Sequence, residues 1–421
     1  MKQYSYMNCK FGKVAFGIFL FAMLLLARDT LITSVILGFN RSQFLMLALI
    51  CIVGLGFLIV CRRELKAVVT DKRLAVLGIA ALVILLPMLL KRDWQMMYFS
   101  ILLCLAFAVF LTYFKSLQET AKWYVALLSA LSVYSLITMY LLKGPAAAGT
   151  LAVLQVTNSN DWPFYNFGLS FVVTWEYWNR NFGIFREPGV YQFFLLLGLY
   201  LNNYAVAWKK TSRMWLVNAI LIVTMLSTFA VGGFIEMGLL AVFLYFDKRW
   251  YRTRWGKTVG IGAAAAVLAA AAYILMQMRQ PGFEQTVFYE FYDMFIRLFT
   301  DSESLTDRFG AIFADIRLFL QNPILGAGIA QVLHAVPNNT SSTLILYAIL
   351  GIVGGTLNVL AWAALTWKRE RCVLGNLILL GILFLSFNTQ NLVADVFFWL
   401  FPMMALTERA VLWLETRKKK V

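Results

Sequence analysis

Charged residues are scarce in this chain of 421 residues: Asp, Glu, Lys and Arg together make up only 14% of it. A soluble domain carries about a quarter charged residues, whereas this sequence is 61% apolar and has a mean hydropathy of +0.74. That balance excludes a water-soluble enzyme, a disordered chain and a collagen-like chain. The composition therefore predicts a polytopic membrane protein.

Histidine and nucleotide-binding motifs are also scarce or absent. The chain has one histidine, which excludes a metal centre built from His and Cys ligands. It has no P-loop and no Asp-x-Asp motif, so neither ATP hydrolysis nor metal-dependent use of a sugar nucleotide is expected. We predict no metal and no cofactor. A transferase with this composition must take a donor that is already activated in the membrane, and a lipid-linked pyrophosphate is the natural candidate.

Long apolar runs predict the membrane spans. A spanning helix needs about 20 mostly apolar residues, because the backbone rises about 1.5 Å per residue across a core of about 30 Å. We identify twelve such segments: 13–30, 43–60, 74–90, 95–114, 124–142, 190–207, 214–230, 233–246, 258–277, 341–366, 373–388 and 392–413. The sequence therefore predicts an all-α protein that forms a single integral membrane domain over residues 1–421.

The distribution of positive charge predicts the orientation. The chain has 37 Lys and Arg residues against 21 Asp and Glu residues. If the twelve spans alternate from a cytoplasmic N-terminus, most of the positive residues fall in cytoplasmic loops, which is the usual bias of membrane proteins. We therefore expect both termini in the cytoplasm. The positive charge is explained by topology, so no nucleic-acid partner is expected.

Two extracytoplasmic loops are long, and they cover residues 143–189 and 278–340. Residues 166–178 of the first loop are apolar enough to be predicted as a re-entrant or interfacial segment. Residues 305–320 of the second loop carry apolar side chains at spacings of three and four, which predicts an amphipathic helix that lies in the interface and roofs a cavity. Arginine binds phosphate through a planar fork of donors. The two loops together contain Arg180, Arg186, Arg279, Arg297, Arg308 and Arg317.

Three segments in these loops resemble the signatures of a known family. Residues 179–192 resemble the central motif of bacterial Wzy-type O-antigen and capsule polymerases, and residues 307–310 and 322–328 resemble the second signature of the same superfamily. The order of the motifs, the large outer loop and the twelve spans agree with that family. The resemblance implies a metal-independent enzyme of the large membrane glycosyltransferase class. Such polymerases join oligosaccharide repeat units that are carried on undecaprenyl pyrophosphate.

The resemblance also assigns the phosphate-binding residues. The growing glycan leaves its lipid pyrophosphate and passes to a hydroxyl of a fresh lipid-linked unit, so the reaction needs positive charge at the departing group. By motif position, Arg186 and Arg308 would bind the pyrophosphate, with Arg180 and Arg317 as secondary candidates. Each of these arginines has a structural alternative, because arginines at a membrane surface also bind lipid phosphates. The Arg186–Glu187 neighbours are alternatively a structural ion pair.

The reaction also needs a base to accept the proton of the attacking hydroxyl. Relatives in the ligase branch use a histidine after the second signature, and His334 is the residue that could match it. The family position itself reads Asn338 and Asn339 here, so these two residues alternatively replace the histidine pair and contact substrate. Glu187 is then the alternative acid or base. Tyr191 and Gln192 are candidates for lining the substrate cavity.

Three functions remain open at this point. The first is polymerisation of lipid-linked repeat units into an O-antigen, common antigen or capsule on the outer side of a bacterial inner (plasma) membrane. The second is an O-antigen ligase that transfers finished polymer to a lipid A core or a protein. The third is a transporter or flippase of lipid-linked glycans, although the sequence lacks the repeated, broken helices that are typical of transporters. For the polymerase, a chain-length regulator and a flippase are candidate partners besides the lipid-linked donor and acceptor.

Overall fold

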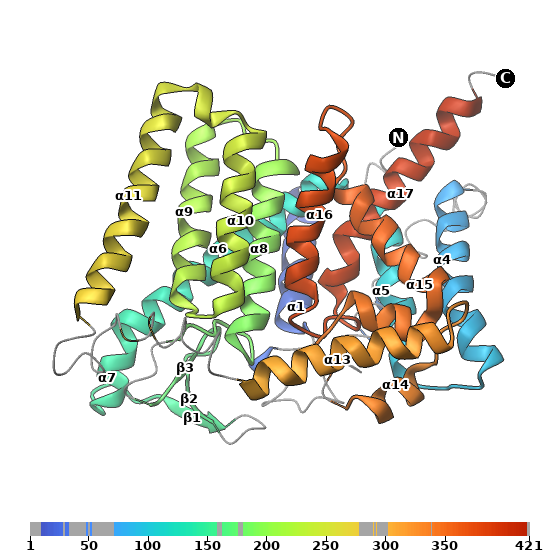
Figure 1. Ribbon diagram of the computed structural model, residues 1–421, viewed down its shortest axis with the longest axis horizontal. Coiled ribbons are helices and arrows are strands. Elements are labelled where there is room, and N and C mark those ends of the chain that lie inside the picture. The colour runs from blue at the N-terminus through green and yellow to red at the C-terminus, as the bar shows by residue number, and fades with distance from the viewer. Residues whose placement is uncertain are drawn as a thin grey trace.

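The computed structural model describes residues 10–27, 30–32, 48, 51–52, 71–157, 162–175, 180–277, 289, 292, 302–337 and 339–418. It consists mainly of helices that run back and forth between two ends of the molecule (Figure 1). The longer helices are α1 (Lys10–Leu25), α4 (Lys72–Leu90), α5 (Met96–Phe114), α6 (Leu117–Ile137), α8 (Pro188–Tyr204), α9 (Thr211–Ser227), α10 (Val231–Asp247), α11 (Arg254–Gln277), α13 (Ser302–Gln321), α15 (Thr343–Thr366), α16 (Val373–Phe387) and α17 (Val396–Lys418). The short ones are the π-helix η4 (Thr138–Leu142), α7 (Lys143–Ala147), the 3-10 helix η5 (Trp250–Arg252) and α14 (Ile329–Ala335).

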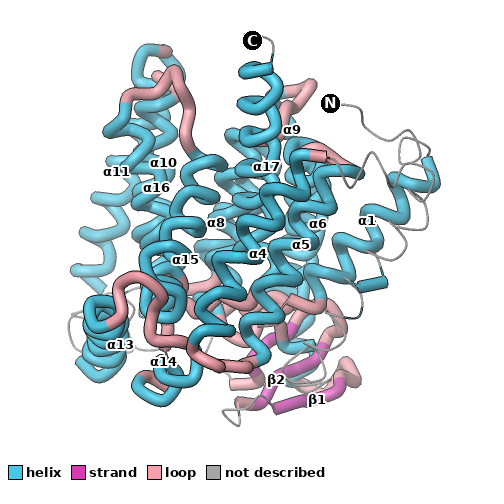
Figure 2. The backbone as a smooth tube through the Cα atoms, turned by 90° about the vertical axis from the view of Figure 1, so that its right-hand side faces the viewer, coloured by secondary structure: helices cyan, strands magenta, loops and turns pink. Residues whose placement is uncertain are grey.

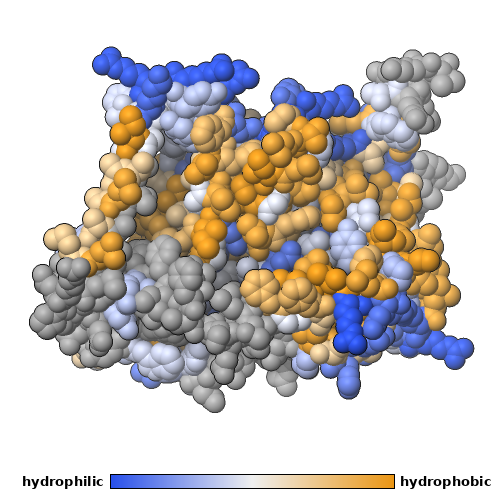
Figure 3. All heavy atoms as spheres, viewed as in Figure 1, coloured by the Kyte–Doolittle hydropathy of each residue, from blue (hydrophilic) through white to orange (hydrophobic). Residues whose placement is uncertain are grey.

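The two ends of the bundle differ in character. We call one the sheet end, because it holds three short strands together with α7, α13 and α14 (Figures 1 and 2). The other, the basic end, holds the connections α8–α9, α10–α11 and α15–α16 and the C-terminal part of α17. Figure 3 shows hydrophilic residues along the basic end and a broad hydrophobic belt between the two ends. This distribution is typical of a membrane protein.

Five helical segments are long and apolar enough to cross a membrane: Lys72–Leu90, Met96–Phe114, Leu117–Ala147, Thr343–Thr366 and Val396–Thr416. Shorter apolar helices occupy Val14–Leu25, Thr211–Ser227 and Val373–Phe387. A helix coincides with each span predicted from the sequence except 43–60, of which only residues 48, 51 and 52 are described. The prediction of a mainly helical chain is therefore confirmed, and five of its helices have the length and composition of membrane spans.

Helix α8 lies at the centre of the main core. It begins at Pro188, where the missing N–H of proline is harmless because the first turn has no intrahelical partner for it. Side chains all around the helix are buried, because α6, α9, α10 and α16 pack against it. A helix that is apolar on every side needs such a complete surround. The N-terminus of α8 is consequently held in a fixed position at the sheet end.

The strands form a small antiparallel sheet in the order β1-β2-β3. They are β1 (Leu154–Thr157), β2 (Pro163–Asn166) and β3 (Phe171–Val173). Phe164 pairs with Val173 across the sheet, and the two pack with Leu31, Phe171 and Phe182 in a second, separate core. The sheet therefore ties the first long loop to the segment after α1.

The sheet includes part of residues 166–178. Their described part, 166–175, holds the last residue of β2, a turn and the edge strand β3, and the predicted re-entrant or interfacial position of the segment stays a prediction. Phe171, Val172 and Val173 are aromatic and β-branched residues, which favour strands, and the strand bonds to β2. A short apolar run does not distinguish a buried strand from a membrane-dipping segment, because both need the same residues.

Helix α15 is broken at Gly351, where φ is 66° and ψ is −162°. The segment that follows α13 docks into this break, and Gly326 there also has a positive φ of 72°. Ala327 N donates to the carbonyl of Ala348 at 2.6 Å, and Ile352 N donates to the carbonyl of Pro323 at 2.7 Å. The turn predicted after residue 322 thus supplies the hydrogen bonds that the broken helix lacks, which a helix in an apolar environment requires.

Helix α13 confirms the helix predicted over 305–320 and extends it slightly at each end. It runs across the sheet end beneath α15 (Figure 1). Phe309, Phe313 and Leu320 are 55%, 67% and 68% exposed, whereas Asp315 and Leu318 are buried against the rest of the protein. The helix therefore turns an apolar face outward, as expected for a helix that lies in a membrane interface.

Candidate functional site

The segment that leads into α8 is folded back tightly onto the bundle at the sheet end. Asn181 holds it there: its Nδ2 donates to Ser135 Oγ at 3.0 Å and to Ser227 Oγ at 2.9 Å. Its Oδ1 accepts the N–H of Gly183 at 2.9 Å. Gly183 has a φ of 54°, and a Cβ there would lie 2.7 Å from the ring of Tyr191. Only glycine fits this close approach, so the fold itself requires part of the first motif.

Arg186 and Glu187 stand at the end of this folded segment. Arg186 Nη2 lies 3.2 Å from Glu187 Oε1, and 34% of each side chain is exposed. Glu187 is the N-cap residue of α8, where a carboxylate is favoured by the positive end of the helix dipole. The pair therefore combines a partly accessible guanidinium with an acid at a fixed backbone position. This combination can bind an anionic group and accept or donate a proton beside it.

Tyr191 and Gln192, predicted as cavity-lining residues, are buried in the bundle. Tyr191 OH lies 3.1 Å from Ser132 Oγ and 3.4 Å from Ser135 Oγ. Gln192 Nε2 donates to the carbonyl of Ala230 at 2.5 Å. Their exposed fractions are 1% and 4%. Both side chains therefore connect α8 to the neighbouring segments beneath Arg186 and Glu187.

A buried acid lies next to Gln192. Glu236, in the second turn of α10, is 3% exposed and lies beside the hydroxyl of Ser386 from α16. A Cβ on Gly232 would lie 3.7 Å from Glu236 Oε1 and 3.9 Å from Gln192 Oε1, so the two polar side chains flank that glycine. The sequence signals Glu236 as an isolated acid at the outer end of an apolar segment. It gives no signal for Ser386 as its neighbour.

Further polar contacts link α8 to α15. Gln390, after α16, faces the first turn of α8, because a Cβ on Gly189 would lie 2.5 Å from Gln390 Nε2. Ser342 Oγ, at the start of α15, donates to the carbonyl of Gln390 at 2.5 Å. Asn388 Oδ1 accepts the N–H of Thr343 at 3.3 Å. Sequence analysis missed these residues, because they lie in two short polar runs, 339–343 and 388–391, that read as ordinary connections between apolar helices.

Asp315 connects α13 to the same region. Its Oδ1 accepts Nδ2 of Asn339 at 2.7 Å, and its Oδ2 accepts the hydroxyl of Ser341 at 2.5 Å. Asp315 is fully buried, and burial raises its pKa from an ordinary 3.8 to about 6, although the hydrogen bonds from Ser341 and Asn339 oppose that rise. Asn339, predicted to contact substrate, thus donates its side-chain hydrogen bond to Asp315. These contacts continue through Ser342 and Gln390 to the foot of α8.

The other predicted residues lie on other segments or outside the described part of the chain. His334 is exposed at the last turn of α14. The first N–H groups of α14 bond to Tyr98 in the first turn of α5 and to Asp93 in the α4–α5 connection. Arg317 is exposed on α13 and Arg180 is half-buried. The side chain of Arg308 and all of Asn338, Arg279 and Arg297 lie outside the described residues.

Part of the second motif has a clear structural role. Lys91 Nζ donates to Asn322 Oδ1 at 3.2 Å, and a Cβ on Gly328 would lie 2.8 Å from Asp93 Oδ2. Together with Gly326 at the break in α15, these residues attach the motif to α4 and α15. Both motif segments therefore lie at the sheet end. Within the described part of the chain, no group of three or more His, Cys, Asp or Glu side chains is placed to hold a metal ion.

A comparison of the chain with protein-family models and with curated proteins finds no match. The resemblance to the Wzy-type polymerases consequently depends on the residues quoted above and remains a prediction.

Proposed function

We propose that the chain is a polysaccharide polymerase with about twelve spans, both termini in the cytoplasm and the sheet end facing outward. It would join oligosaccharide repeat units carried on undecaprenyl pyrophosphate, at the outer side of a bacterial inner membrane. The observation that carries the proposal is the partly exposed Arg186–Glu187 pair at the rigid N-terminus of α8. The contacts from Asp315 to Gln390 support it, because they join the regions of the two motifs at one end of the bundle.

The orientation follows from charge. The basic end carries the connections around residues 207–213, 248–257 and 367–372, which contain many Lys and Arg residues. Such connections stay in the cytoplasm in most membrane proteins, so the opposite, sheet end would face the periplasm or cell exterior. Lipid-linked repeat units would then reach the site from the outer leaflet, and their prenyl chains would stay in the bilayer.

In the proposed reaction a hydroxyl oxygen of the acceptor unit attacks the anomeric carbon of the donor glycan. The bond between that carbon and the pyrophosphate oxygen breaks, and the pyrophosphate leaves with its lipid. Arg186 would stabilise the charge that develops on this leaving group, together with Arg308. The proton of the attacking hydroxyl would pass to a base, for which Glu187 is the better placed of the two candidates, because it adjoins Arg186 whereas His334 lies on α14.

The test is complementation of the source strain after deletion of its own copy, with the surface-glycan ladder as the readout. Arg186→Ala and Arg186→Lys are compared with Arg92→Ala, a matched control because Arg92 is an exposed arginine between α4 and α5 at the same end. We expect Arg186→Ala to leave only single-repeat product at normal membrane abundance, and Arg92→Ala to give a full ladder. A full ladder from Arg186→Ala would refute the assignment of the site.

The same assay separates the two alternatives. A ligase would restore attachment of preformed polymer without lengthening it. A transporter would be required only when donor and acceptor lie on opposite faces of a membrane. Purified protein in detergent has no such faces, so lengthening of lipid-linked glycans there would exclude transport as the activity.

A further inference from the structure

A groove runs between α9 and α10 on the outside of the bundle, with α8 as its floor. Its volume is about 230 Å³. One wall includes Ala219 and Ile222 from α9, the other includes Leu240 and Ala241 from α10, and Leu199 lies on the floor. The neighbouring surface of α9 and α10 consists of exposed apolar side chains. These include Leu216, Val223, Leu239 and Val242.

The lining of the groove is almost entirely apolar. Its two asparagines bond to each other, since Asn203 Nδ2 donates to Asn218 Oδ1 at 2.9 Å and Asn218 Nδ2 donates to Asn203 Oδ1 at 3.2 Å. An occupant that fits this lining is a flexible apolar chain. Trp215 and Trp250 border the groove, with ring centroids 4.8 Å apart. Paired tryptophans are common where an apolar chain meets a polar headgroup.

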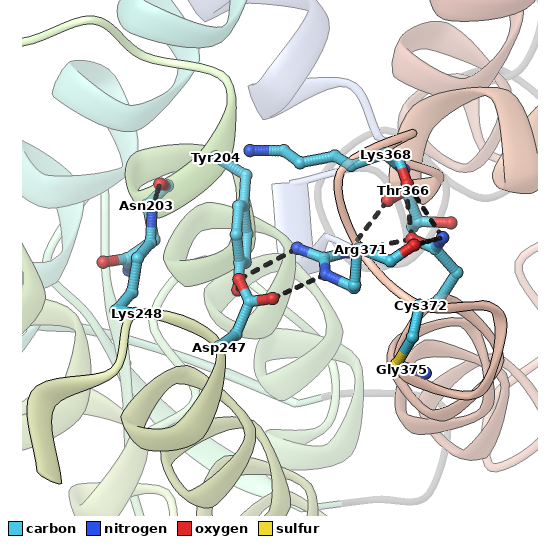
Figure 4. A network of polar contacts seen from close by, with 10 residues as sticks. Asn203, Tyr204, Asp247, Lys248, Thr366, Lys368, Arg371, Cys372 and Gly375 are labelled. Atoms are coloured by element: carbon cyan, nitrogen blue, oxygen red, sulfur yellow. Dashed lines mark hydrogen bonds and ion pairs between the residues drawn. The ribbon is translucent and has the colours of Figure 1, made fainter.

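Positive charge surrounds that same end of the groove. The α8–α9 connection and the first turn of α9 contribute Lys209, Lys210 and Arg213. The α10–α11 connection and the first residue of α11 contribute Lys248, Arg249, Arg252 and Arg254. Residues 205–215 and 248–257 contain no Asp or Glu. Lys248 links this charge to the groove, because its Nζ donates to the carbonyl of the groove residue Asn203 at 3.3 Å (Figure 4).

The nearest acid does not offset these charges. Asp247 is bound by Arg371, whose Nε and Nη2 lie 2.7 Å and 3.0 Å from its two oxygens, and by Tyr204 OH at 2.7 Å (Figure 4). Lys248, Lys368 and Arg371 all lie over the ring of Tyr204 at about 5 Å or less. The end of the groove therefore has a surplus of positive charge beside an apolar channel.

We propose that the groove binds one acyl chain of an anionic phospholipid of the cytoplasmic leaflet, and that the two basic connections bind its phosphate. Charge complementarity selects an anionic headgroup, since a zwitterionic lipid offers no net charge to the seven cations. The apolar, internally satisfied lining selects the chain. This site lies at the opposite end of the bundle from Arg186, so it is separate from the proposed reaction.

The test measures lipid binding to the full-length purified protein by native mass spectrometry, with phosphatidylglycerol and phosphatidylcholine of matched chains as probes. We expect phosphatidylglycerol to bind more tightly than phosphatidylcholine. The triple variant Arg213→Gln, Arg249→Gln and Arg252→Gln changes only exposed residues at the basic end, and it should weaken phosphatidylglycerol binding by about a hundredfold. Arg369→Gln, an exposed arginine of the α15–α16 connection, is the matched control and should bind as the wild type does.

A second variant tests the groove itself. Ala241→Phe adds a ring inside the groove without changing charge, and it should reduce phosphatidylglycerol binding while retention on size-exclusion chromatography stays normal. Glycerol phosphate, which has the headgroup and no acyl chain, should not compete. Equal binding of the two lipids, or full binding by Ala241→Phe, would overturn the proposal. So would displacement of phosphatidylglycerol by a lower concentration of undecaprenyl phosphate, because the groove would then belong to a prenyl chain.

Discussion

The close backbone contact between Gly326 and Gly351 provides a specific test of the fold at the sheet end. The perturbation is Gly351→Ala, a change of one methyl group. Gly351 has φ 66° and ψ −162°, a combination that is essentially restricted to glycine. A Cβ there would overlap the carbonyl of Ile324 and lie 2.6 Å from the backbone nitrogen of Gly326. Neither neighbour is a side chain that could rotate away.

The expected cost follows from two ways of relieving this overlap. If the backbone keeps its path, alanine in this region costs about 1–3 kcal/mol, and the overlap adds to that. If the loop detaches, three backbone hydrogen bonds are lost: those donated by Ala327, Gly328 and Ile352. At about 1 kcal/mol each, their loss costs roughly 3 kcal/mol. The variant should adopt whichever of these two responses costs less free energy, so we expect a local destabilisation of about 3 kcal/mol.

Hydrogen–deuterium exchange of the detergent-solubilised protein measures this locally. A loss of about 3 kcal/mol raises the open fraction on the order of a hundredfold, so peptides that cover residues 323–328 and 348–352 should exchange about that much faster. Gly381→Ala in α16 is the matched control, because nothing lies within 4 Å of its added Cβ. Alanine should slightly strengthen that helix. Unchanged exchange in Gly351→Ala would show that the loop does not dock into the break.

Three further predictions concern buried polar contacts. Burial raises the pKa of Asp315 from 3.8 to about 6, so the folded protein binds a proton at this residue more tightly than the unfolded chain does. The free energy of unfolding should therefore fall as the pH rises from about 4 to about 6 and stay low above that. The total decrease should be at most about 3 kcal/mol. Melting curves at pH 5.0 and 7.5 should show about half of this difference, roughly 1.4 kcal/mol, in the wild type and should lose it in Asp315→Asn. Tyr191→Phe removes the hydroxyl that contacts two serines and should cost about 1–2 kcal/mol in thermal denaturation. Arg371→Gln removes the bidentate partner of Asp247 and should lower the free energy of unfolding by about 3 kcal/mol. Adding Asp247→Asn should recover part of that loss in a double-mutant cycle.

The helices that run between the sheet end and the basic end could be predicted from the sequence, because each is a long apolar run. The predicted 233–246 and 373–388 correspond to α10 and α16 within two residues at either end. The helix predicted over 305–320 was found for a related reason, since its period of 3.6 separates it from the spans. The length of an apolar run and the period of its apolar residues are local properties of the sequence, and the folded structure retains both.

The parts that depend on distant partners could not be predicted. Strand β3 is three residues long, and its identity is fixed by bonds to β2. In the sequence, Gly351 cannot be told from any other glycine in an apolar helix, and the break there becomes apparent only from its contact with Gly326. Ser386 is a single polar residue in an apolar helix, and Gln390 belongs to a short polar run after that helix. The role of each is apparent only when α10 and α8 are placed beside them. For the candidate site, sequence analysis identified Arg186 and Glu187 and missed the surroundings that position them.

The first motif contains both buried residues and residues that stay partly exposed. Asn181, Gly183 and Tyr191 are buried, and each makes a contact that a substitution would remove or crowd. Their presence follows from packing alone. The Arg186–Glu187 pair differs, because a third of each side chain is exposed and an ion pair of that kind contributes at most about 1 kcal/mol. If the motif were structural throughout, Arg186→Ala would change both stability and glycan length little. The proposed chemistry instead requires that it abolish the glycan ladder while the melting temperature stays close to that of the wild type.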